Sequence, residues 1–481
     1  MVFNSLQYIF LFLPIVAIVN YCICKLSKKA SRLFITMISA WFYYEVADAN
    51  VIWLSISCLI TFSCYKLITA NIKPFVCAII GITFNVAMLC FFKYKYLLPT
   101  LTGIEKTAFI DLLTPVAISF FVFQQISFIV DVYKNKISKI SLLNYLYYVL
   151  FFPKMVAGPI TRFDRLIYGS TDTTTTYRLL AGFMIFSVGL YKKVVLSSIF
   201  AQIADVGYAA QTPLSMIDAW MTSLSYTMQI YYDFSGYSDM AIGSALILGI
   251  SLPANFNSPY KAVNIRDFWS RWHISLSTWL RDYVYIPLGG SRKGYPATLV
   301  NLLITFTISG AWHGATINFI LWGLLHGLAT IINTSWSKLG FSMPKALGLL
   351  LTFLFINFSW VPFRAQTLDK AISVYQSMLG LHAYGIINWW PVSMTTVPMH
   401  NYDVYKEIIA WGIRSSASIL ILAVCIALAL TAKNSNEMAC HETPNPIVRL
   451  RYAVLCGLLA AISVICLFGG SGTSTFIYAN F

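Results

Sequence analysis

The residues that could do chemistry are histidines placed in apolar sequence. His313 and His326 both lie in the run 301–328, NLLITFTISGAWHGATINFILWGLLHGL. A titratable side chain inside a membrane segment is a functional candidate by default, and imidazole, with an ordinary pKa of ~6.5, suits general acid–base work. The alternative for each is a structural hydrogen bond to a neighbouring helix. The two are 13 residues apart, and Gly310 and Gly314 favour a helix break beside His313.

A third histidine lies in a segment that is too charged for an ordinary membrane span. Residues 265–283 read IRDFWSRWHISLSTWLRDY, with two Asp and three Arg, and each central charge costs ~2.5–3.5 kcal/mol on insertion scales. The apolar residues recur at helical spacing and form one stripe, with His273 at its edge beside Arg266 and Ser277. Either this is an interfacial amphipathic helix anchored by Trp and Arg, or it dips into the protein and presents His273 to a wet cavity.

Basic side chains gather along and just after this segment. They are Arg266, Arg271, Arg281, Arg292 and Lys293. Together they would form a basic mouth on the cytoplasmic side, which suits an anionic substrate.

Two further polar runs interrupt apolar sequence. In YYDFSGYSD, residues 231–239, Asp233 and Asp239 lie between two predicted membrane segments, and a spacing of six residues puts them on different faces of one helix. We expect a structural role, bonding helix ends or the arginines of 265–283. The run PKMVAGPI, residues 153–160, reads as a helix ended by Pro and Gly that shapes a re-entrant loop.

The composition shows what kind of molecule must position these residues. Of the 481 residues, 58% are hydrophobic and only 11% are charged, and the mean hydropathy is +0.70. This excludes a soluble enzyme, a disordered protein and a fibrous protein, because a soluble surface needs roughly a quarter of its residues charged. We predict an all-α polytopic membrane protein with one domain over 1–481. Its ten cysteines include no C-x-x-C pair, and no Cys/His cluster has zinc spacing, so no metal site is predicted.

Apolar runs of membrane-spanning length recur along the whole chain. We predict about 11–13 membrane segments, some of them re-entrant. The candidates are 3–23, 33–44 with 50–70, 75–92, 108–130, 140–157, 179–203, 215–232, 237–252, 297–311, 315–334, 346–362, 411–432 and 452–470.

The basic residues give the orientation. The net charge is +15, and Lys and Arg concentrate in cytoplasmic loops and meet anionic lipid headgroups, so the excess does not predict nucleic-acid binding. Lys25, Lys28 and Lys29 follow the first apolar run, and 433–451 is also basic, which places both termini outside and makes the number of crossings even. The polar stretch 382–407 is predicted to be an outside loop or surface helix. Lys93 does not fit the alternation.

The motifs together resemble the membrane-bound O-acyltransferase (MBOAT) family, in its bacterial branch of alginate O-acetyltransferases and D-alanyl-lipoteichoic-acid transferases. The likeness covers nearly the whole chain. It is carried by MVFNSLQYIFLFLP, FFPKMVAGPITRF, QIYYDFSGYSDMAIG, NFNSPYKAVNIRDFWSRWHISLSTWLRDYVYIPLGGSR, SGAWHGATINFILWGLLHG and GGSGTSTFIYANF. The D-F-S-G-Y-S-D-M run and the F-I-Y-A-N-F ending favour the acetylating members.

The resemblance implies a ring of tilted helices around a reaction tunnel, and roles for individual residues. The His of W-H-G, His313, is the catalytic one, as general base or transient acyl carrier, and the His of R-W-H-x-S, His273, is the second polar residue of the tunnel. We expect Trp312, Asp233, Asp239, Ser277, Asn318 and His326 to line or support that tunnel. The basic residues 266, 271, 281, 292 and 293 would attract coenzyme A phosphates.

The implied reaction is acetyl transfer from a cytoplasmic thioester, acetyl-CoA, to an extracytoplasmic polysaccharide of the alginate, cellulose or peptidoglycan type. No cofactor would be permanently bound, and a periplasmic SGNH-type partner would receive the acetyl group beyond the bacterial cytoplasmic membrane. One alternative is D-alanyl transfer from a carrier protein to teichoic acid. A channel or transporter with a polar pore is another, although no inverted repeat is visible. A scaffold for the partner, in which His313 is dispensable, is a third.

Overall fold

The computed structural model describes residues 1–95, 114–168, 176–381, 417–439 and 446–469. Within these ranges every regular element is a helix and no strand occurs. Seven helices among the described residues are long and apolar enough to cross a membrane, and the ranges Ile118–Tyr133 and Ala417–Thr431 form shorter apolar helices. The chain is therefore a multi-pass, all-helical membrane protein, as predicted. The predicted outside loop at 382–407 and the C-terminus lie outside the described residues.

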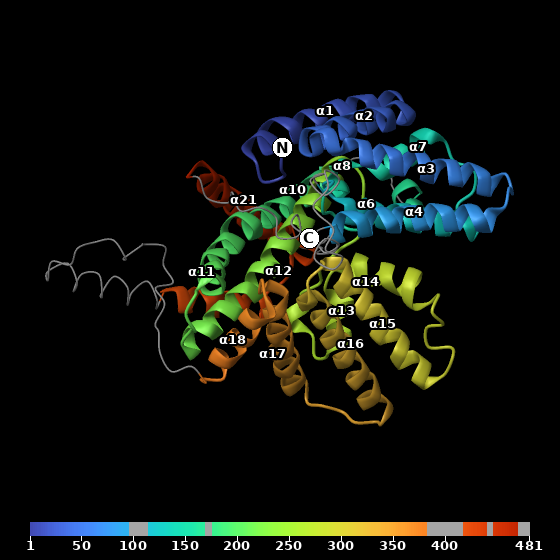
Figure 1. Ribbon diagram of the computed structural model, residues 1–481. Helices are drawn as coiled ribbons and strands as arrows, with labels where there is room; N and C mark the ends of the chain where they lie inside the picture. Colours follow the sequence, from blue (N-terminus) through green and yellow to red (C-terminus); the bar gives the residue numbers. More distant parts are fainter. Residues whose placement is uncertain (96–113, 169–175, 382–416, 440–445, 470–481) are drawn as a thin grey trace.

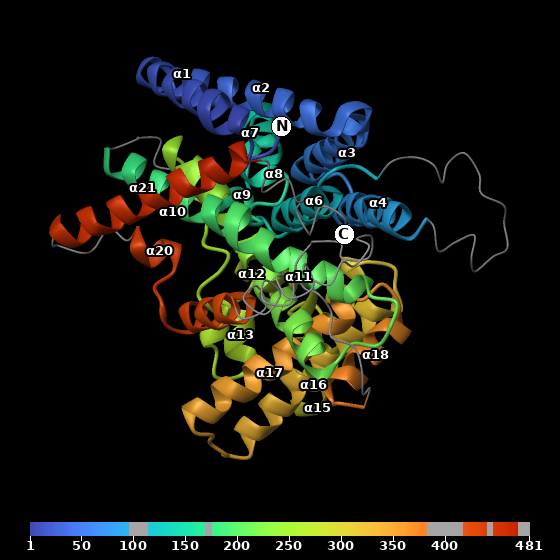
Figure 2. The same cartoon turned by 90° about the vertical axis from the view of Figure 1, so that its left-hand side faces the viewer.

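The helices form three groups that follow one another along the chain (Figures 1 and 2). The N-terminal group comprises η1 (Tyr8–Phe12), α1 (Leu13–Leu26), α2 (Lys28–Ala47), η2 (Asp48–Asn50), α3 (Val51–Thr69), α4 (Pro74–Tyr94), α6 (Ile118–Tyr133), α7 (Leu142–Leu150), α8 (Phe152–Met155) and α9 (Phe163–Ile167). The central group comprises α10 (Thr176–Tyr191), η3 (Lys192–Leu196), α11 (Ser197–Ala209) and α12 (Met216–Ile247). The third group comprises η4 (Pro259–Lys261), α13 (Ile265–Arg271), α14 (Ile274–Leu280), η5 (Arg281–Tyr285), α15 (Tyr295–His313), α16 (Ile317–Lys338), α17 (Lys345–Arg364) and α18 (Leu368–Met378), after which come α20 (Ser435–Met438) and α21 (Pro446–Phe468).

Two reciprocal glycine pairs hold α10 against α12. A Cβ on Gly189 would lie 2.7 Å from the carbonyl oxygen of Gly236, and a Cβ on Gly236 would lie 2.7 Å from that of Gly189. Gly182 and Gly243 make the same reciprocal contact two turns away, with distances of 2.9 and 2.6 Å. Small residues let membrane helices approach this closely, and van der Waals contact then drives their association. The packing of α10 against α12 is therefore the main helix contact of the central group.

Lysines on the turn after α10 pair with the two carboxylates of α12. Lys192 Nζ lies 2.7 Å from Asp239 Oδ2, and Lys193 forms a fully buried ion pair with Asp233. Ser197 adds a hydrogen bond of 3.1 Å to Asp233 Oδ1. The structural role expected for Asp233 and Asp239 is thus supported, although their partners are lysines of η3 and not the arginines of 265–283.

The break predicted between 215–232 and 237–252 is wrong. The structure has one helix, α12, from Met216 to Ile247, because Gly236 packs on α10 and the carboxylates on either side of it are neutralised. The segment 140–157, predicted to be one membrane segment, is instead divided into two helices. The chain turns at Phe151 between α7 and α8, and the stretch Phe151–Met155 is buried inside the protein.

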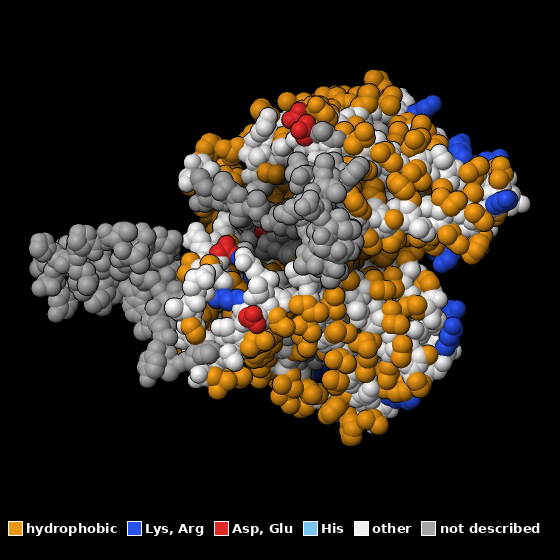
Figure 3. Space-filling view, viewed as in Figure 1, with side chains coloured by type: hydrophobic (Ala, Val, Ile, Leu, Met, Phe, Trp, Pro, Cys, Tyr) orange, Lys and Arg blue, Asp and Glu red, His pale blue; other side chains and the backbone are white. Residues whose placement is uncertain are grey.

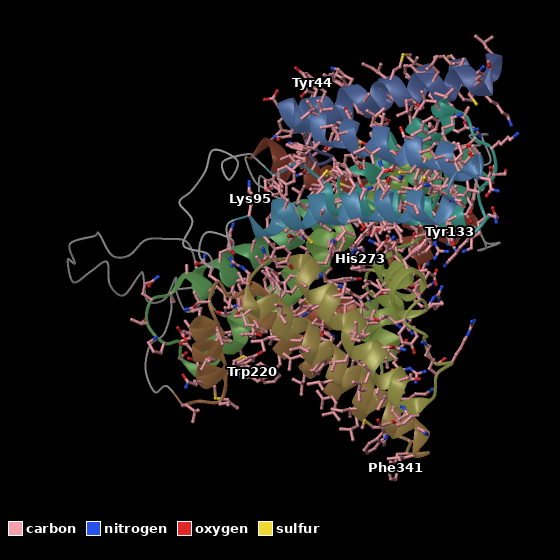
Figure 4. All side chains as sticks on the ribbon, turned by 45° about the vertical axis from the view of Figure 1, so that its right-hand side comes forward. Tyr44, Lys95, Tyr133, Trp220, His273 and Phe341 are labelled. Carbon is pink, nitrogen blue, oxygen red and sulfur yellow. The ribbon has the colours of Figure 1, made fainter. Side chains whose placement is uncertain are left out.

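The prediction of one continuous helix over 265–283 is also wrong. Asn264 caps α13 through a hydrogen bond of 2.9 Å from the Asp267 N–H, and the helix ends at Arg271. His273 has φ 42°, in the left-handed region that an α-helix cannot contain, and α14 starts directly after it. Figure 4 shows His273 in the interior, between the third group below and the N-terminal group above. The segment therefore carries His273 into the interior, while Arg266, Ser270 and Arg281 stay exposed.

The outer surface fits a membrane environment. Hydrophobic side chains cover most of the face shown in Figure 3, and Lys and Arg gather along its right-hand edge. Many large apolar residues of α1, α3, α4 and α16 are exposed, among them Ile18, Leu59, Ile80 and Ile332. Such a surface is unfavourable in water and favourable against lipid.

Candidate functional site

His313 occupies the end of a helix in the middle of the protein. It is the last residue of α15, only 2% of its surface is exposed, and α16 begins four residues later at Ile317. The break predicted beside His313 is therefore present. Aromatic rings surround the imidazole, with ring centres 4.6 Å away at Trp312, 5.1 Å at Trp322 and 4.9 Å at Phe363.

Close packing of α15 on α16 fixes the direction of this helix end. A Cβ on Gly310 would lie 2.3 Å from the Phe319 carbonyl oxygen, and one on Gly323 would lie 2.4 Å from that of Phe306. Gly310 thus lies inside α15, and it serves the helix crossing, not the break for which it was proposed. Gly310 and Gly323 let α15 and α16 pack closely as an antiparallel helix pair, and His313 lies where the chain passes from one helix to the other.

The end of α4 holds the end of α15. Lys93 Nζ donates a hydrogen bond to the carbonyl oxygen of Trp312, and Tyr94 Oη donates one of 2.6 Å to that of Ala311. The last carbonyls of a helix lack intrahelical partners and carry the negative end of its dipole, so a cation is favourable there. The lysine that did not fit the charge alternation is therefore explained: it contacts the residue before His313.

His273 is held by one amide side chain. Its Nδ1 lies 3.1 Å from Asn255 Oδ1, an oxygen that also accepts hydrogen bonds from the Ser275 N–H at 3.2 Å and the Ser275 hydroxyl at 2.8 Å. Because an amide oxygen only accepts, Nδ1 carries the hydrogen and Nε2 is the acceptor nitrogen. Sequence reasoning missed Asn255 as a site residue, although it lies in the quoted motif NFNSPY.

His326 takes part in a closed hydrogen-bond network. Its Nδ1 lies 3.3 Å from the Trp269 indole nitrogen, and its Nε2 lies 3.1 Å from the Ser359 hydroxyl, which in turn donates to the Ile356 carbonyl at 2.8 Å. The imidazole is fully buried and links α13, α16 and α17. This arrangement favours a supporting role for His326.

The two candidate histidines are brought to the same aromatic cluster. Trp272, next to His273, lies 5.1 Å from Trp360, which stacks at 5.8 Å on Trp322, the ring that contacts His313. The cavities described below are lined by other residues, so a tunnel joining His273 to His313 stays a prediction.

The other predicted site residues lie in different surroundings. Trp312 stacks on Phe123 at 5.1 Å, Asn318 Nδ2 donates to the Ala365 carbonyl at 2.8 Å, and Ser277 bonds the Trp272 carbonyl at 3.3 Å. Asp233 and Asp239 belong to the lysine pairs of the central group. No group of three His, Cys, Asp or Glu side chains within the described ranges could hold a metal ion.

Three indole N–H groups near His313 lack a hydrogen-bond partner among the described residues. They belong to Trp312, Trp322 and Trp360, and each nitrogen is buried. Other tryptophans are satisfied: Trp279 donates to the Phe123 carbonyl at 3.0 Å and Trp220 to that of Met378 at 3.0 Å. Trp312 and Trp322 contact the His313 ring, and Trp360 stacks on Trp322. Since buried polar groups are nearly always paired, these donors, which have no partner among the described residues, suggest a place for a ligand oxygen.

Only part of the predicted basic mouth shares a cavity. Arg266 and Arg281 line a cavity of about 420 Å³ together with Trp269, Ser277 and Phe306. Arg271 instead pairs with Asp267 at 2.7 Å within α13. Arg292 and Lys293 are exposed after η5 and are not among the residues that line this cavity.

The model of the membrane-bound O-acyltransferase family matches residues 79–368, more than half of the chain, and this range includes every residue of the site. The chain belongs to the membrane-bound O-acyltransferase family. It is therefore an acyltransferase, as predicted, and the channel and scaffold alternatives are not supported.

Individual members of the membrane-bound O-acyltransferase family resemble the chain over different lengths. A peptidoglycan O-acetyltransferase of Helicobacter pylori is 37% identical, over 100% of this chain and 98% of its own length. A probable alginate O-acetylase of Pseudomonas putida is 36% identical over 79% of this chain and 80% of its own length. A teichoic acid D-alanyltransferase of Bacillus subtilis is 28% identical over 53% of this chain and 70% of its own length. The acetylating relatives thus match more of the chain.

Lys93 is expected to act as a positioning residue in this acyltransferase. Lys93→Met removes the charged donor at the end of α15, and a hydrogen bond from a charged group contributes ~1.5–3 kcal/mol, so we expect acyl transfer to fall about tenfold or more. The loss should appear mainly in kcat, because His313 would be misplaced while donor binding is untouched. Steady-state kinetics on purified protein measures kcat and the KM for the donor separately.

Lys73→Met is the matched control, since Lys73 is exposed at the opposite end of α4. Lys93→Arg should restore part of kcat because it keeps the charged donor. A Lys93→Met enzyme with unchanged kcat would mean that the contact with Trp312 is dispensable for positioning.

Proposed function

We propose that the protein transfers acetyl from acetyl-CoA, supplied at the cytoplasmic face, to a hydroxyl of an extracytoplasmic polysaccharide. The observation that carries this proposal is His313, buried at the broken end of α15 beside indole N–H groups that have no hydrogen-bond partner among the described residues. Similarity along the whole chain to a peptidoglycan O-acetyltransferase supports acetyl as the group and a glycan as the acceptor.

In the proposed mechanism His313 is the general base. It takes the proton of the acceptor hydroxyl while that oxygen forms a bond to the acetyl carbon. The carbon–sulfur bond then breaks, and the proton passes from His313 to the departing thiolate. A positioned base contributes ~10²–10⁴ to such a step. Transient acetylation of His313 itself is the alternative mechanism. In either mechanism, His273 would orient the thioester carbonyl or the acceptor.

The indole donors supply what the sequence alone did not show, a site for the developing negative charge. Trp312 and Trp322 flank the His313 ring, and their N–H groups have no partner among the described residues. We assign them to the carbonyl oxygen of the acetyl group, which becomes an oxyanion during the attack. Fixed donors aimed at developing charge act strongly in a site without water.

The cavity with Arg266 and Arg281 is proposed as the donor entrance. Its wall includes two guanidinium groups in a mainly apolar lining, and Arg281 also pairs with Asp282 at 2.7 Å. Arg266→Gln and Arg281→Gln should therefore raise KM for acetyl-CoA severalfold with little change in kcat, and the effect should shrink at high salt. Arg271→Gln is the control, because Arg271 pairs with Asp267 outside this cavity. Equal KM values in all three variants would exclude this entrance.

Two further proposals concern the arrangement of the protein in the membrane and its protein partner. A ring of helices around a tunnel in the bacterial cytoplasmic membrane, with the N-terminus outside, would connect the donor entrance to the outer face. A periplasmic SGNH-type protein would complete glycan modification there.

The experiment that tests the proposed function supplies purified protein with acetyl-CoA or, separately, with a D-alanyl carrier protein, and measures release of the free thiol. Release of thiol from acetyl-CoA, but not from the D-alanyl carrier protein, supports the proposal. Release only from the D-alanyl carrier would replace it with the teichoic acid reaction.

A further inference from the structure

A basic cavity lies beside the turn that joins α1 to α2. Its volume is about 300 Å³, which is at the lower end of the range for small-molecule sites. Lys25 of α1 and Lys28 and Arg32 of α2 line it, and the residues Leu248 and Ile250 that follow α12 form its apolar wall. The mechanism proposed above uses none of these residues.

The charged residues that line this cavity all have the same sign. No Asp or Glu of the described ranges is among the lining residues. Lys28 and Arg32 are four residues apart on α2, a spacing at which like charges on a helix repel each other. The Arg32 guanidinium is held in place by a hydrogen bond of 3.3 Å from its Nη1 to Asn144 Oδ1 of α7. Three cations around one space favour an anion within it.

Neutral hydrogen-bonding groups lie between the cations. Asn20 and Ser31 both line the cavity and are buried, and the Ser31 hydroxyl donates a hydrogen bond of 2.7 Å to Asn20 Oδ1. Asn20 Nδ2 in turn donates one of 3.5 Å to the Leu248 carbonyl. These bonds join α1, α2 and the end of α12, so the buried part of the cavity is formed before any ligand binds. Phosphate oxygens are strong acceptors for the Lys and Arg donors placed around it.

The cavity lies at the end of a membrane span, where lipid headgroups are found. The span Tyr8–Leu26 ends beside Lys25, and Ile18 and Tyr21 of the same helix are exposed. In Figure 1, α1 leads from the N-terminus toward the edge at which Figure 3 shows Lys and Arg. Acyl chains that leave the cavity along α1 would therefore reach the hydrocarbon layer. Basic pockets between membrane helices are known sites for anionic headgroups.

The position of the cavity in the fold separates it from the candidate active site. Figures 1 and 2 both show α1 and α2 on the opposite side of the molecule from α15 and α16, which carry His313 and His326. This separation favours a lipid over the acyl donor as the source of the phosphate.

We infer that this cavity binds the phosphate group of an anionic phospholipid, whose acyl chains lie along the exposed apolar residues of α1. Lys25, Lys28 and Arg32 neutralise the phosphate. The bound lipid links the α1–α2 turn to the end of α12, and it thereby stabilises the contact between the N-terminal and central groups. The inference does not depend on which acyl donor or acceptor the protein uses.

The test measures lipid binding in the absence of any acyl donor. Purified full-length protein in a nonionic detergent is titrated with dioctanoyl phosphatidylglycerol, with dioctanoyl phosphatidylcholine and with inorganic phosphate, and native mass spectrometry gives each Kd. Phosphatidylglycerol should bind at least about tenfold more tightly than phosphatidylcholine or inorganic phosphate, and it should raise Tm. Lys28→Gln and Arg32→Gln should each raise Kd for phosphatidylglycerol about fivefold, as expected for one cation beside a headgroup.

Lys29→Gln is the matched control, because Lys29 is exposed on the same turn but does not line the cavity. Its Kd should equal that of the wild type. Lys28→Gln keeps the test decisive if Arg32→Gln, which also loses the bond to Asn144, fails to fold.

Three results would overturn the inference. Equal binding of the two lipids, or the same Kd in Lys28→Gln and Lys29→Gln, would mean that lipid merely coats this surface. Inorganic phosphate that binds as tightly as phosphatidylglycerol would make a soluble phosphate the ligand. A raised KM for acetyl-CoA in Lys28→Gln would assign the cavity to the donor. Lipid binding by a protein that transfers no acetyl would refute the proposed function and leave this inference standing.

Discussion

Replacing His313 with alanine is expected to lower acetyl transfer by at least ~10²-fold, or about 3 kcal/mol of barrier. The substitution removes the proposed base from the end of α15, while the Gly310–Gly323 crossing and the Lys93 contact that hold this end remain. The fold should therefore survive. Transfer of radiolabelled acetyl from acetyl-CoA to glycan, measured at matched membrane expression, gives the result.

Two other histidines provide the comparison for His313→Ala. His273→Ala should impair turnover less, because orientation is only part of the barrier. His326→Ala should reduce yield or stability more than turnover per folded molecule, because His326 bonds both Trp269 and Ser359. Folded, well-expressed His313→Ala protein with near wild-type transfer would disprove both the site and the mechanism.

Trp322→Phe is expected to lower kcat by ~10²-fold, within the range found when one oxyanion donor is removed. The substitution keeps an aromatic ring beside His313 and deletes the indole N–H, which has no partner among the described residues. Unfolding should be little affected, since no hydrogen bond within the described structure is lost. Steady-state kinetics and thermal unfolding of the same preparation separate the two effects.

Trp279→Phe is the matched control, because the Trp279 N–H has a partner, the Phe123 carbonyl. Loss of this hydrogen bond in Trp279→Phe should lower the free energy of unfolding by ~1 kcal/mol and leave kcat close to wild type. The opposite pattern, with Trp322→Phe fully active and Trp279→Phe slow, would remove the indoles near His313 from the mechanism.

The sequence predicted the features that depend on local pattern. Membrane helices, the family and the break beside His313 follow from apolar runs, motifs and Gly314, and each is present. The roles of His313 and His273 came from the resemblance and stay predictions. Periodicity failed at 265–283, because a helical stripe continues through Trp272 and His273 although the backbone turns there.

Long-range contacts account for what the sequence could not reveal. Nothing local to Lys93 indicates that it caps a helix more than two hundred residues away. The unbroken α12 depends on Gly189 and on Lys193, which belong to other elements. In the same way, the sequence gives no sign that the Trp322 indole N–H lacks a hydrogen-bond partner within the described ranges, because that depends on residues distant along the chain.

The Lys–Asp pairs between η3 and α12 bear on how the chain enters its bilayer during synthesis. Lys192 and Lys193 emerge from the ribosome about forty residues before Asp233 and Asp239. Each charge left alone in lipid costs ~2.5–3.5 kcal/mol on insertion scales. The run α10–η3–α11 is thus poorly suited to pass into lipid by itself, and it becomes well suited once α12 pairs with it. We expect the unit of insertion to be the hairpin that α10–η3–α11 forms with α12, held at the translocation channel until the carboxylates of α12 arrive.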